Sequence, residues 1–358
     1  MTIERPGSLA DELLTRLPRS PDVYPQKIDY ASLMVLLVQF DVGAYAAASF
    51  LDDRILGPAT KGAWIPVDRA IEASQRVANA RPVHFIFHTG HVGSTLVSRL
   101  LDETGQVLSL REPLPLRTLA DAHDVLSQPE ALLSTGQFDI ALAMFMRLWS
   151  RGFDETGSVV VKATSSAGRL AVPILAAAER SRAIYMNLRA EPYLATLLAG
   201  QNSPTDLRGH GPGRMRRLQA RIGSPLAPLH ALSIGELAAM SWLAESWTQR
   251  DAVTRLAGRV IALDFDHFLA NVADGMRRIL AHFELAENAR YLAEVDRSPV
   301  LTRYSKAPEH AYTPNVRAEV LRDSRRRNHE EISKGMAWLA SQARSDRTVA
   351  EILDRAGD

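Results

Sequence analysis

Cysteine is absent from the 358-residue chain, which excludes disulfide bonds, thiolate metal sites and a cysteine nucleophile. Net charge is almost absent as well. The formal value is +1, so no overall field favours nucleic acid or an anionic membrane, and any positive site must be local. Long apolar runs are lacking, because the early run over residues 31–40 stops at Asp41 and is too short to cross a bilayer. The first 18 residues also lack the apolar core of a signal peptide. We therefore expect a soluble, cytoplasmic protein with no membrane or nucleic-acid partner.

Residues 1–80 are expected to form a helical extension ahead of the main domain. Residues 1–25 are polar and rich in proline, which predicts a mobile or draped arm. Residues 28–56 carry apolar side chains at helical spacing. These apolar positions are Leu33, Leu36, Leu37 and Phe40. A further helix is predicted to start with Asp68 as its cap and to run to about residue 80.

Strands alternate with helices over residues 81–310. Short apolar runs bounded by turn residues predict five strands, at 83–87, 107–110, 159–162, 183–186 and 260–263. Helical periodicity predicts helices at 96–101, 131–151, 172–180, 234–256 and 272–283. This order implies right-handed crossovers and a three-layer α/β domain around a parallel sheet of about five strands. The glycine- and proline-rich residues 202–213 are expected to be a long loop. Residues 311–358 are expected to be an Arg-rich helical tail packed on the same domain.

An anion-binding loop is predicted where the strand at 83–87 meets the helix that follows it. Gly90 and Gly93 allow tight turns, and the first N–H groups of the helix favour an anion. The predicted contacts are Thr89, Gly90, His91, Val92, Gly93, Ser94 and Thr95. The alternative is a turn that needs glycine only for packing. Two residues separate the glycines and no lysine follows, so the loop is not a Walker A motif, and no dinucleotide-type glycine spacing is present.

Four segments in order resemble the P-loop sulfotransferases, nearest to the tyrosylprotein and heparan-type branch. The segment 90–96, Gly-His-Val-Gly-Ser-Thr-Leu, resembles the 5′-phosphosulfate loop of that family. The strand Val159-Val160-Val161-Lys162 is similar to one that ends in lysine in the tyrosylprotein branch. Residues 179–192 resemble the segment that binds the 3′-phosphate, and residues 261–268 resemble a C-terminal element. The resemblance covers residues 82–310 and leads us to expect a bacterial member with a P-loop NTPase-like fold of the sulfotransferase type.

The resemblance implies a donor, an acceptor and two catalytic side chains. The donor would be 3′-phosphoadenosine-5′-phosphosulfate, and a sulfuryl group would pass in line to a hydroxyl or amine of an unknown small-molecule or glycan acceptor, with no metal. Glu112 stands where the family places its general base. Lys162, at the carboxyl end of an apolar strand, would stabilise the leaving oxygen. The alternatives are a Glu112 carboxylate paired with Arg111 or Arg117, and a strand-end Lys162 reaching solvent.

The family's nucleotide contacts match this sequence less closely. Arg189 fits the arginine that grips the 3′-phosphate. The family's next serine would fall on Leu197, so Thr196 is a shifted substitute, or else only a helix-face hydroxyl. Ser298 and Lys306 correspond to a serine and a lysine near the nucleotide, or else belong to a polar surface loop.

His91 is the largest departure, because the family has arginine or lysine at that position. An imidazole is only partly charged near neutral pH and is a weaker anion clamp. It would support catalysis together with Lys162, or the donor differs, or catalysis is lost. The alternative functions are therefore a nucleotide-binding, kinase-like enzyme and a non-catalytic member of the superfamily.

Several arginines around residues 202–221 allow two interpretations, a lid over an anionic ligand or a solvated basic helix face. They are Arg208, Arg214, Arg216, Arg217 and Arg221. The run 325–327 is expected to be solvated in the same way. Aromatic residues do not alternate with these cations, which argues against nucleic-acid binding. Trp242 and Trp247 are expected in the core.

Overall fold

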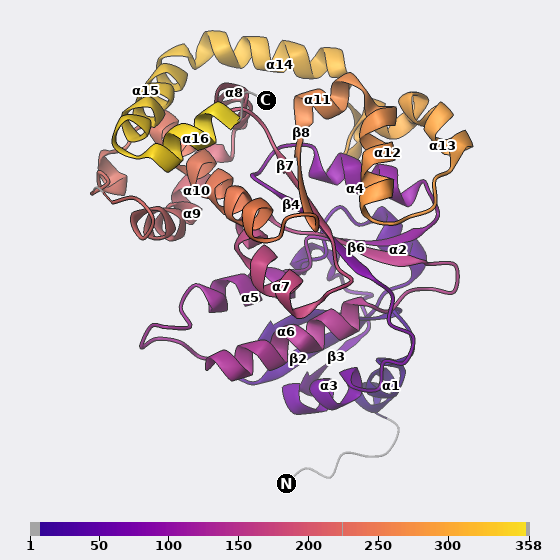
Figure 1. Cartoon of the computed structure of the whole chain (residues 1–358). Helices are drawn as coiled ribbons and strands as arrows, with labels where there is room; N and C mark the ends of the chain where they lie inside the picture. The colour runs from indigo at the N-terminus through magenta and orange to yellow at the C-terminus, as the bar shows by residue number, and fades with distance from the viewer. Residues whose placement is uncertain (1–7, 224, 356–358) are drawn as a thin grey trace. The chain divides into compact units, whose positions relative to one another are not determined.

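The central sheet confirms the predicted α/β class. The computed structural model describes residues 8–223 and 225–355, and its central sheet has five parallel strands flanked by helices, in the order β5-β6-β4-β7-β8 (Figure 1). The strands are β4 (Val83–His88), β5 (Val107–Arg111), β6 (Ser158–Lys162), β7 (Ala183–Asn187) and β8 (Val260–Asp264). Every residue of β4 and of β6 is buried, as a strand covered on both faces requires.

The five predicted helices are also present, with others between them. The first group is α1 (Leu9–Arg16), α2 (Val42–Ala47), α3 (Val67–Ser74), α4 (Ser94–Asp102), α5 (Leu114–His123), α6 (Thr135–Trp149) and α7 (Ala171–Ala177). The second group is α8 (Ala190–Ala199), α9 (Ser203–Gln219), α10 (Ile234–Arg255), α11 (Phe265–Ala270), α12 (Val272–His282) and α13 (Ala289–Glu294). The C-terminal tail is helical as predicted, with α14 (Pro314–Arg327), α15 (His329–Ser345) and α16 (Arg347–Arg355).

The chain divides into two compact units. The first comprises Met1–Ile86, Thr95–Ala183 and Met276–Ala293. The second comprises Phe87–Ser94, Ile184–Gly275 and Glu294–Asp358.

The first unit contains an antiparallel sheet where we expected helices. Strands β1 (Val23–Asp29), β2 (Met34–Gln39) and β3 (Gly62–Pro66) pair in that order, so the helix predicted over residues 28–56 is wrong. Burial along β2 alternates over its first residues, with Val35 and Leu37 inside and Met34 and Leu36 half-exposed. Residues 33–38 are apolar at every position, so they allow a strand as well as a helix, and the β-branched valines of β2 favour the strand.

Residues 8–25 are not a mobile arm, because a buried arginine fastens them. The Arg151 guanidinium donates through Nη1 to the carbonyl oxygens of Leu17, Ser20 and Val23 at 2.5, 2.7 and 3.0 Å. Part of the arm is the helix α1. Residues 1–7 lie outside the described residues. The helix α3 also departs from its prediction, since it ends at Ser74 and Asp68 lies in its first turn rather than at its cap.

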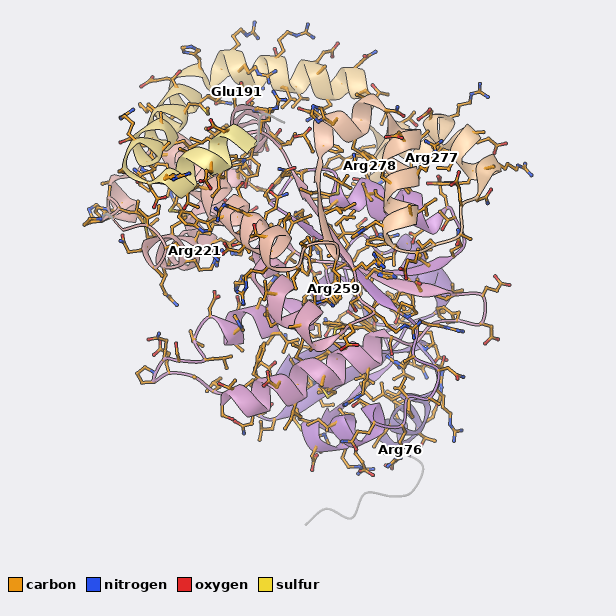
Figure 2. All side chains as sticks on the ribbon, viewed as in Figure 1. Arg76, Glu191, Arg221, Arg259, Arg277 and Arg278 are labelled. Atoms are coloured by element: carbon orange, nitrogen blue, oxygen red, sulfur yellow. The ribbon has the colours of Figure 1, made fainter. Side chains whose placement is uncertain are left out.

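The second unit corrects the predicted loop at 202–213, which lies inside helix α9. Arg214 and Arg217 of α9 pair with Oε1 of Glu245 in α10 at 3.1 and 2.9 Å, and Glu245 is fully buried. A buried carboxylate of this kind requires paired cations, so these two arginines form neither a lid nor a solvated face. Arg221, labelled in Figure 2, likewise pairs with Asp251.

Two further features of this unit concern its packing. The backbones of helices α10 and α15 approach closely at Gly235. A Cβ at this position would lie 1.8 Å from the Glu331 carbonyl oxygen, so only glycine fits there. Trp242 and Trp247 are buried as predicted, and the Trp242 indole donates to the Leu188 carbonyl oxygen at 2.9 Å. The tail arginines Arg325, Arg326 and Arg327 are all exposed, as predicted, and Arg325 also binds both carboxylate oxygens of Glu191.

Candidate functional site

The loop between β4 and α4 has an unusual backbone conformation, with several residues at positive φ. Gly90, His91 and Gly93 all have positive φ, at 110°, 55° and 72°. A Cβ on Gly93 would lie 2.0 Å from the ring of Phe265 in α11, so that position accepts glycine alone on two independent grounds. Gly93 is thus required both for the turn and for packing against Phe265. The two interpretations of the loop, an anion-binding loop and a turn that needs glycine for packing, do not exclude each other.

Thr89 anchors the loop from the protein interior. Its N–H donates to the Met186 carbonyl oxygen at 3.0 Å, and its carbonyl oxygen accepts from the Tyr193 hydroxyl at 3.0 Å. The side-chain oxygens of Thr89 and Thr95 are buried and have no hydrogen-bond partner among residues 8–223 and 225–355. An unsatisfied buried hydroxyl costs about 1–3 kcal/mol. A hydroxyl without a partner beside a strand–helix loop, such as that of Thr89, fits a polar ligand such as the oxyanion of phosphosulfate.

His91 is exposed and adopts the left-handed conformation, which is uncommon outside glycine. Its backbone conformation therefore suits the loop, whereas its side chain supplies less charge than the arginine or lysine of the family pattern.

Glu112 and Lys162, in the first unit, form a buried ion pair. Lys162 Nζ binds Glu112 Oε1, the lysine side chain is 0% exposed and the glutamate side chain 11% exposed. The Glu112 N–H also donates to the Lys162 carbonyl oxygen at 2.6 Å. Both alternative interpretations are therefore wrong: Glu112 pairs with neither arginine, and Lys162 does not reach solvent.

Sequence reasoning singled out both residues but missed that they are partners. In the sheet register Arg111 lies opposite Lys162, and Ile86 lies opposite Lys162 on the other side of β6. A glutamate and a lysine at the carboxyl ends of adjacent parallel strands are the signal that would have revealed the pair. Glu112 itself has a φ of 53°, a strained conformation for a residue other than glycine.

Arg111 holds the chain segment that carries Glu112. It is 1% exposed, and it donates to the carbonyl oxygens of Tyr45 and Ala48 at 3.1 and 2.7 Å and to Ser98 Oγ at 3.1 Å. It also pairs with Asp102. Burial, assisted by the charge of Arg99, lowers the pKa of Arg111 to about 9. Sequence reasoning considered Arg111 only as a partner of Glu112 and missed this anchoring role.

Arg189, in the second unit, caps helix α8 and lines a cavity of 610 Å³. Glu191, Asp264, Asp266 and His267 also line this cavity. Its carboxylates are partly neutralised from α14, because Arg317 pairs with Asp266 at 2.7 Å and Arg325 binds Glu191, which is labelled in Figure 2. The cavity therefore presents an exposed arginine beside carboxylates that already have partners.

The remaining predicted nucleotide contacts have local hydrogen bonds. The Thr196 hydroxyl donates to the Pro192 carbonyl oxygen at 2.7 Å, as its helix-face interpretation predicts. Ser298 is buried and its Oγ accepts from the Val300 N–H at 3.1 Å. Lys306 lies between β9 (Arg303–Tyr304) and β10 (Ala307–Ala311). The nucleotide roles of these three residues stay predictions.

Two features are absent from residues 8–223 and 225–355. No group of three or more histidine, aspartate or glutamate side chains there can hold a metal ion. No helix in this part of the chain is long and apolar enough to cross a membrane.

Three solved structures are similar to the chain at low sequence identity. The sulfotransferase domain from the curacin biosynthetic pathway is 13% identical, with 66% of this chain and 86% of that chain covered and a TM-score of 0.39. The sulfotransferase STF9 from Mycobacterium avium is 13% identical, with 90% and 97% covered and a TM-score of 0.38. The sulfotransferase domain of the Synechococcus PCC 7002 olefin synthase is 15% identical, with 68% and 94% covered and a TM-score of 0.37. No protein-family model and no curated protein sequence matches the chain. The function proposed below rests on the chain's own residues.

Proposed function

We propose that this protein transfers a sulfuryl group from 3′-phosphoadenosine-5′-phosphosulfate to a hydroxyl or amine acceptor. The buried Glu112–Lys162 pair carries the proposal, because it unites a carboxylate and an ammonium at the ends of two neighbouring strands. Lys162 also lies opposite Ile86, three residues before Thr89, where the loop between β4 and α4 begins. A base, a cation and an anion-binding loop are the groups that such a transfer needs.

The two members of the pair have complementary roles. When bound, the donor supplies the activated sulfur, whose bond to the 5′-phosphate oxygen breaks as a bond to the acceptor oxygen or nitrogen forms. Lys162 neutralises the charge that develops on the departing phosphate oxygen. Glu112 accepts the proton that the acceptor loses. Adenosine 3′,5′-bisphosphate and the sulfated acceptor are released.

We assign donor binding to the loop and to the cations of the second unit. The N–H groups and hydroxyls of residues 89–95 would hold the phosphosulfate, with His91 adding partial charge. Arg189 would bind the 3′-phosphate through its guanidinium. Thr196, Ser298 and Lys306 would complete the nucleotide site.

Calorimetric titration with adenosine 3′,5′-bisphosphate, followed by mass spectrometry of mixed phenol and sugar acceptors incubated with donor, tests the proposal. We expect binding, and an acceptor product heavier by one sulfuryl group. Glu112→Gln should bind the bisphosphate as the wild type does and lose about 10²–10⁴-fold in kcat. Glu130→Gln, a change at an exposed glutamate of the same unit, should lose nothing. Failure of the wild type to bind the bisphosphate would refute the function, whereas full turnover by Glu112→Gln would refute only the base.

A non-catalytic binding protein is the second candidate, favoured by the imidazole of His91 where a permanent cation is expected. Donor that is bound but never consumed would support it. Magnesium-dependent turnover of ATP would instead support the kinase-like alternative, against which the missing Walker lysine counts.

A further inference from the structure

Residues 50–54 lie against the turn that carries Glu112, and main-chain hydrogen bonds make the contact. The Leu51 N–H donates to the Arg111 carbonyl oxygen at 2.7 Å, and the Leu51 carbonyl oxygen accepts from the Leu114 N–H at 3.1 Å. Glu112 falls between these two attachment points in sequence. The segment 50–54 is therefore fixed beside the proposed base.

Arg54 is held in one orientation within this segment. Its Nε and Nη2 donate to the two carboxylate oxygens of Asp52 at 2.8 and 2.5 Å, and its Cζ lies 3.4 Å from the centroid of the Phe50 ring. Its side chain is nevertheless 56% exposed. Hydrogen bonding to Asp52, and to a smaller degree the charge of Glu112, raises the pKa of Arg54. A permanently charged guanidinium held in this way is preorganised to bind a further anion.

Arg117 is a second cation near this segment, because it lies in α5 three residues after Leu114, whose N–H donates to the Leu51 carbonyl oxygen. Burial works against ionisation of Asp52, but hydrogen bonds from Arg54 and the charge of Arg117 leave the pKa of Asp52 lowered. Arg117 Nε is buried and lacks a hydrogen-bond partner within the part of the chain that the structure describes. A buried N–H of a charged group with no acceptor is costly, so an incoming acceptor atom would be stabilised there.

The charges around the base do not cancel. Asp52 can neutralise only one of the two guanidinium groups, while Lys162 neutralises Glu112. One positive charge is therefore left beside the proposed base. At close range this charge attracts an anion.

We propose that Arg54 and Arg117 bind an anionic group of the acceptor, so that the substrates are hydroxyl or amine compounds that also carry a carboxylate, sulfate or phosphate. The inference rests on the proposed sulfuryl transfer and deepens it by naming the acceptor class. The anionic group anchors the acceptor, and the anchoring brings its hydroxyl or amine to Glu112.

Two matched pairs of probes test the inference. Methyl β-glucuronide is compared with methyl β-glucoside, and 4-hydroxyphenylacetate with its amide, by turnover with donor and by calorimetric binding to protein saturated with bisphosphate. We expect the carboxylate member of at least one pair to be preferred about tenfold or more, since a hydrogen bond to a charged group is worth that much. Arg54→Gln and Arg117→Gln should each remove most of this preference without changing bisphosphate affinity. Arg76→Gln, at an arginine near α3 that is paired with Glu72, should change nothing (Figure 2).

The outcomes separate this inference from the function on which it rests. Absence of bisphosphate binding by the wild type refutes both. Bisphosphate binding without a preference for the carboxylate member in either pair, in binding or in turnover, overturns the anionic acceptor while leaving donor binding intact. A preference that survives in both glutamine variants overturns the assignment to Arg54 and Arg117. Equal thermal unfolding midpoints of the variants and the wild type show that any loss is not a loss of folding.

Discussion

Substitutions can remove the two charges of the Glu112–Lys162 pair one at a time, and the burial of the pair determines how much free energy of unfolding is lost. Lys162→Met keeps the apolar stem and removes the ammonium, leaving a carboxylate that is 11% exposed without its partner. Breaking one side of a buried pair costs about 3–5 kcal/mol, because the remaining charge stays desolvated. Removing both charges, in Lys162→Met with Glu112→Leu, should recover most of that loss, since a buried pair can be replaced by apolar groups with little net cost.

Urea unfolding, followed by tryptophan fluorescence and circular dichroism, measures the free energy of unfolding of both single variants and the double variant. We expect a coupling free energy of about 3 kcal/mol between the two positions. Lys334→Met, which removes an exposed lysine paired with Glu330 and Glu331, is the control and should have little measurable effect. Additive losses in the double variant would refute the buried pair, as would a Lys162→Met protein as stable as the wild type.

Three further predictions concern other parts of the fold. Burial lowers the pKa of His84 to about 4, so the unfolded chain binds more protons below pH 6.5. The contribution of neutral His84 to the free energy of unfolding is therefore fully present above that pH. About 2 kcal/mol of it should be lost between pH 7 and pH 5, as measured by urea titrations. The variant His84→Asn should flatten this slope. Gly93→Ala should lower the unfolding midpoint more than Gly105→Ala, because both have positive φ but only Gly93 meets Phe265. Equal losses would contradict that contact. Arg151→Met should expose residues 8–25 to limited proteolysis, since three carbonyl oxygens lose their donor. An unchanged cleavage pattern would argue against the fastening.

The central domain was predictable because its strands are short, apolar and bounded by turn residues. The run 159–162 has no polar residue before Lys162, and a buried parallel strand needs only such a run. Helices between the strands were identified by the same reasoning, with errors at their ends. The loop between β4 and α4 was likewise predictable as a tight turn, since Gly90 and Gly93 stand between a strand and a helix, whereas anion binding by this loop stays a prediction.

The N-terminal sheet was not predictable in the same way. Leu33, Leu36 and Leu37 satisfy a helical period, but residues 33–38 are apolar at every position and therefore allow a strand as well. Only the pairing with β1 and β3 decides between the two. The helix α9 was hidden for the opposite reason. Glycine and proline within residues 202–213 disfavour a helix, but the packing of α9 against α10, with Leu207 and Leu218 buried, overrides that local preference.

The candidate site was predictable residue by residue but not as an arrangement. Glu112 and Lys162 lie 50 residues apart in sequence, and only the sheet register makes them neighbours. Residues 50–54 reach the same turn through two main-chain hydrogen bonds, which leave no trace in side-chain pattern. The acceptor-binding role that we propose for this segment could therefore not be predicted from the sequence.

Several features at Glu112 are unfavourable in free energy, and a function explains them better than a contribution to stability does. Its backbone is held at a positive φ, which costs of order 1–3 kcal/mol for a residue other than glycine. Its carboxylate and the Lys162 ammonium are both desolvated, although apolar side chains of similar volume would fill that space at little or no cost. The guanidinium of Arg111 is also buried, and it holds the chain beside the same turn. The strain of this turn and the desolvation of its ion pair do not make the fold more stable. They make sense if the position and charge of Glu112 serve a reaction.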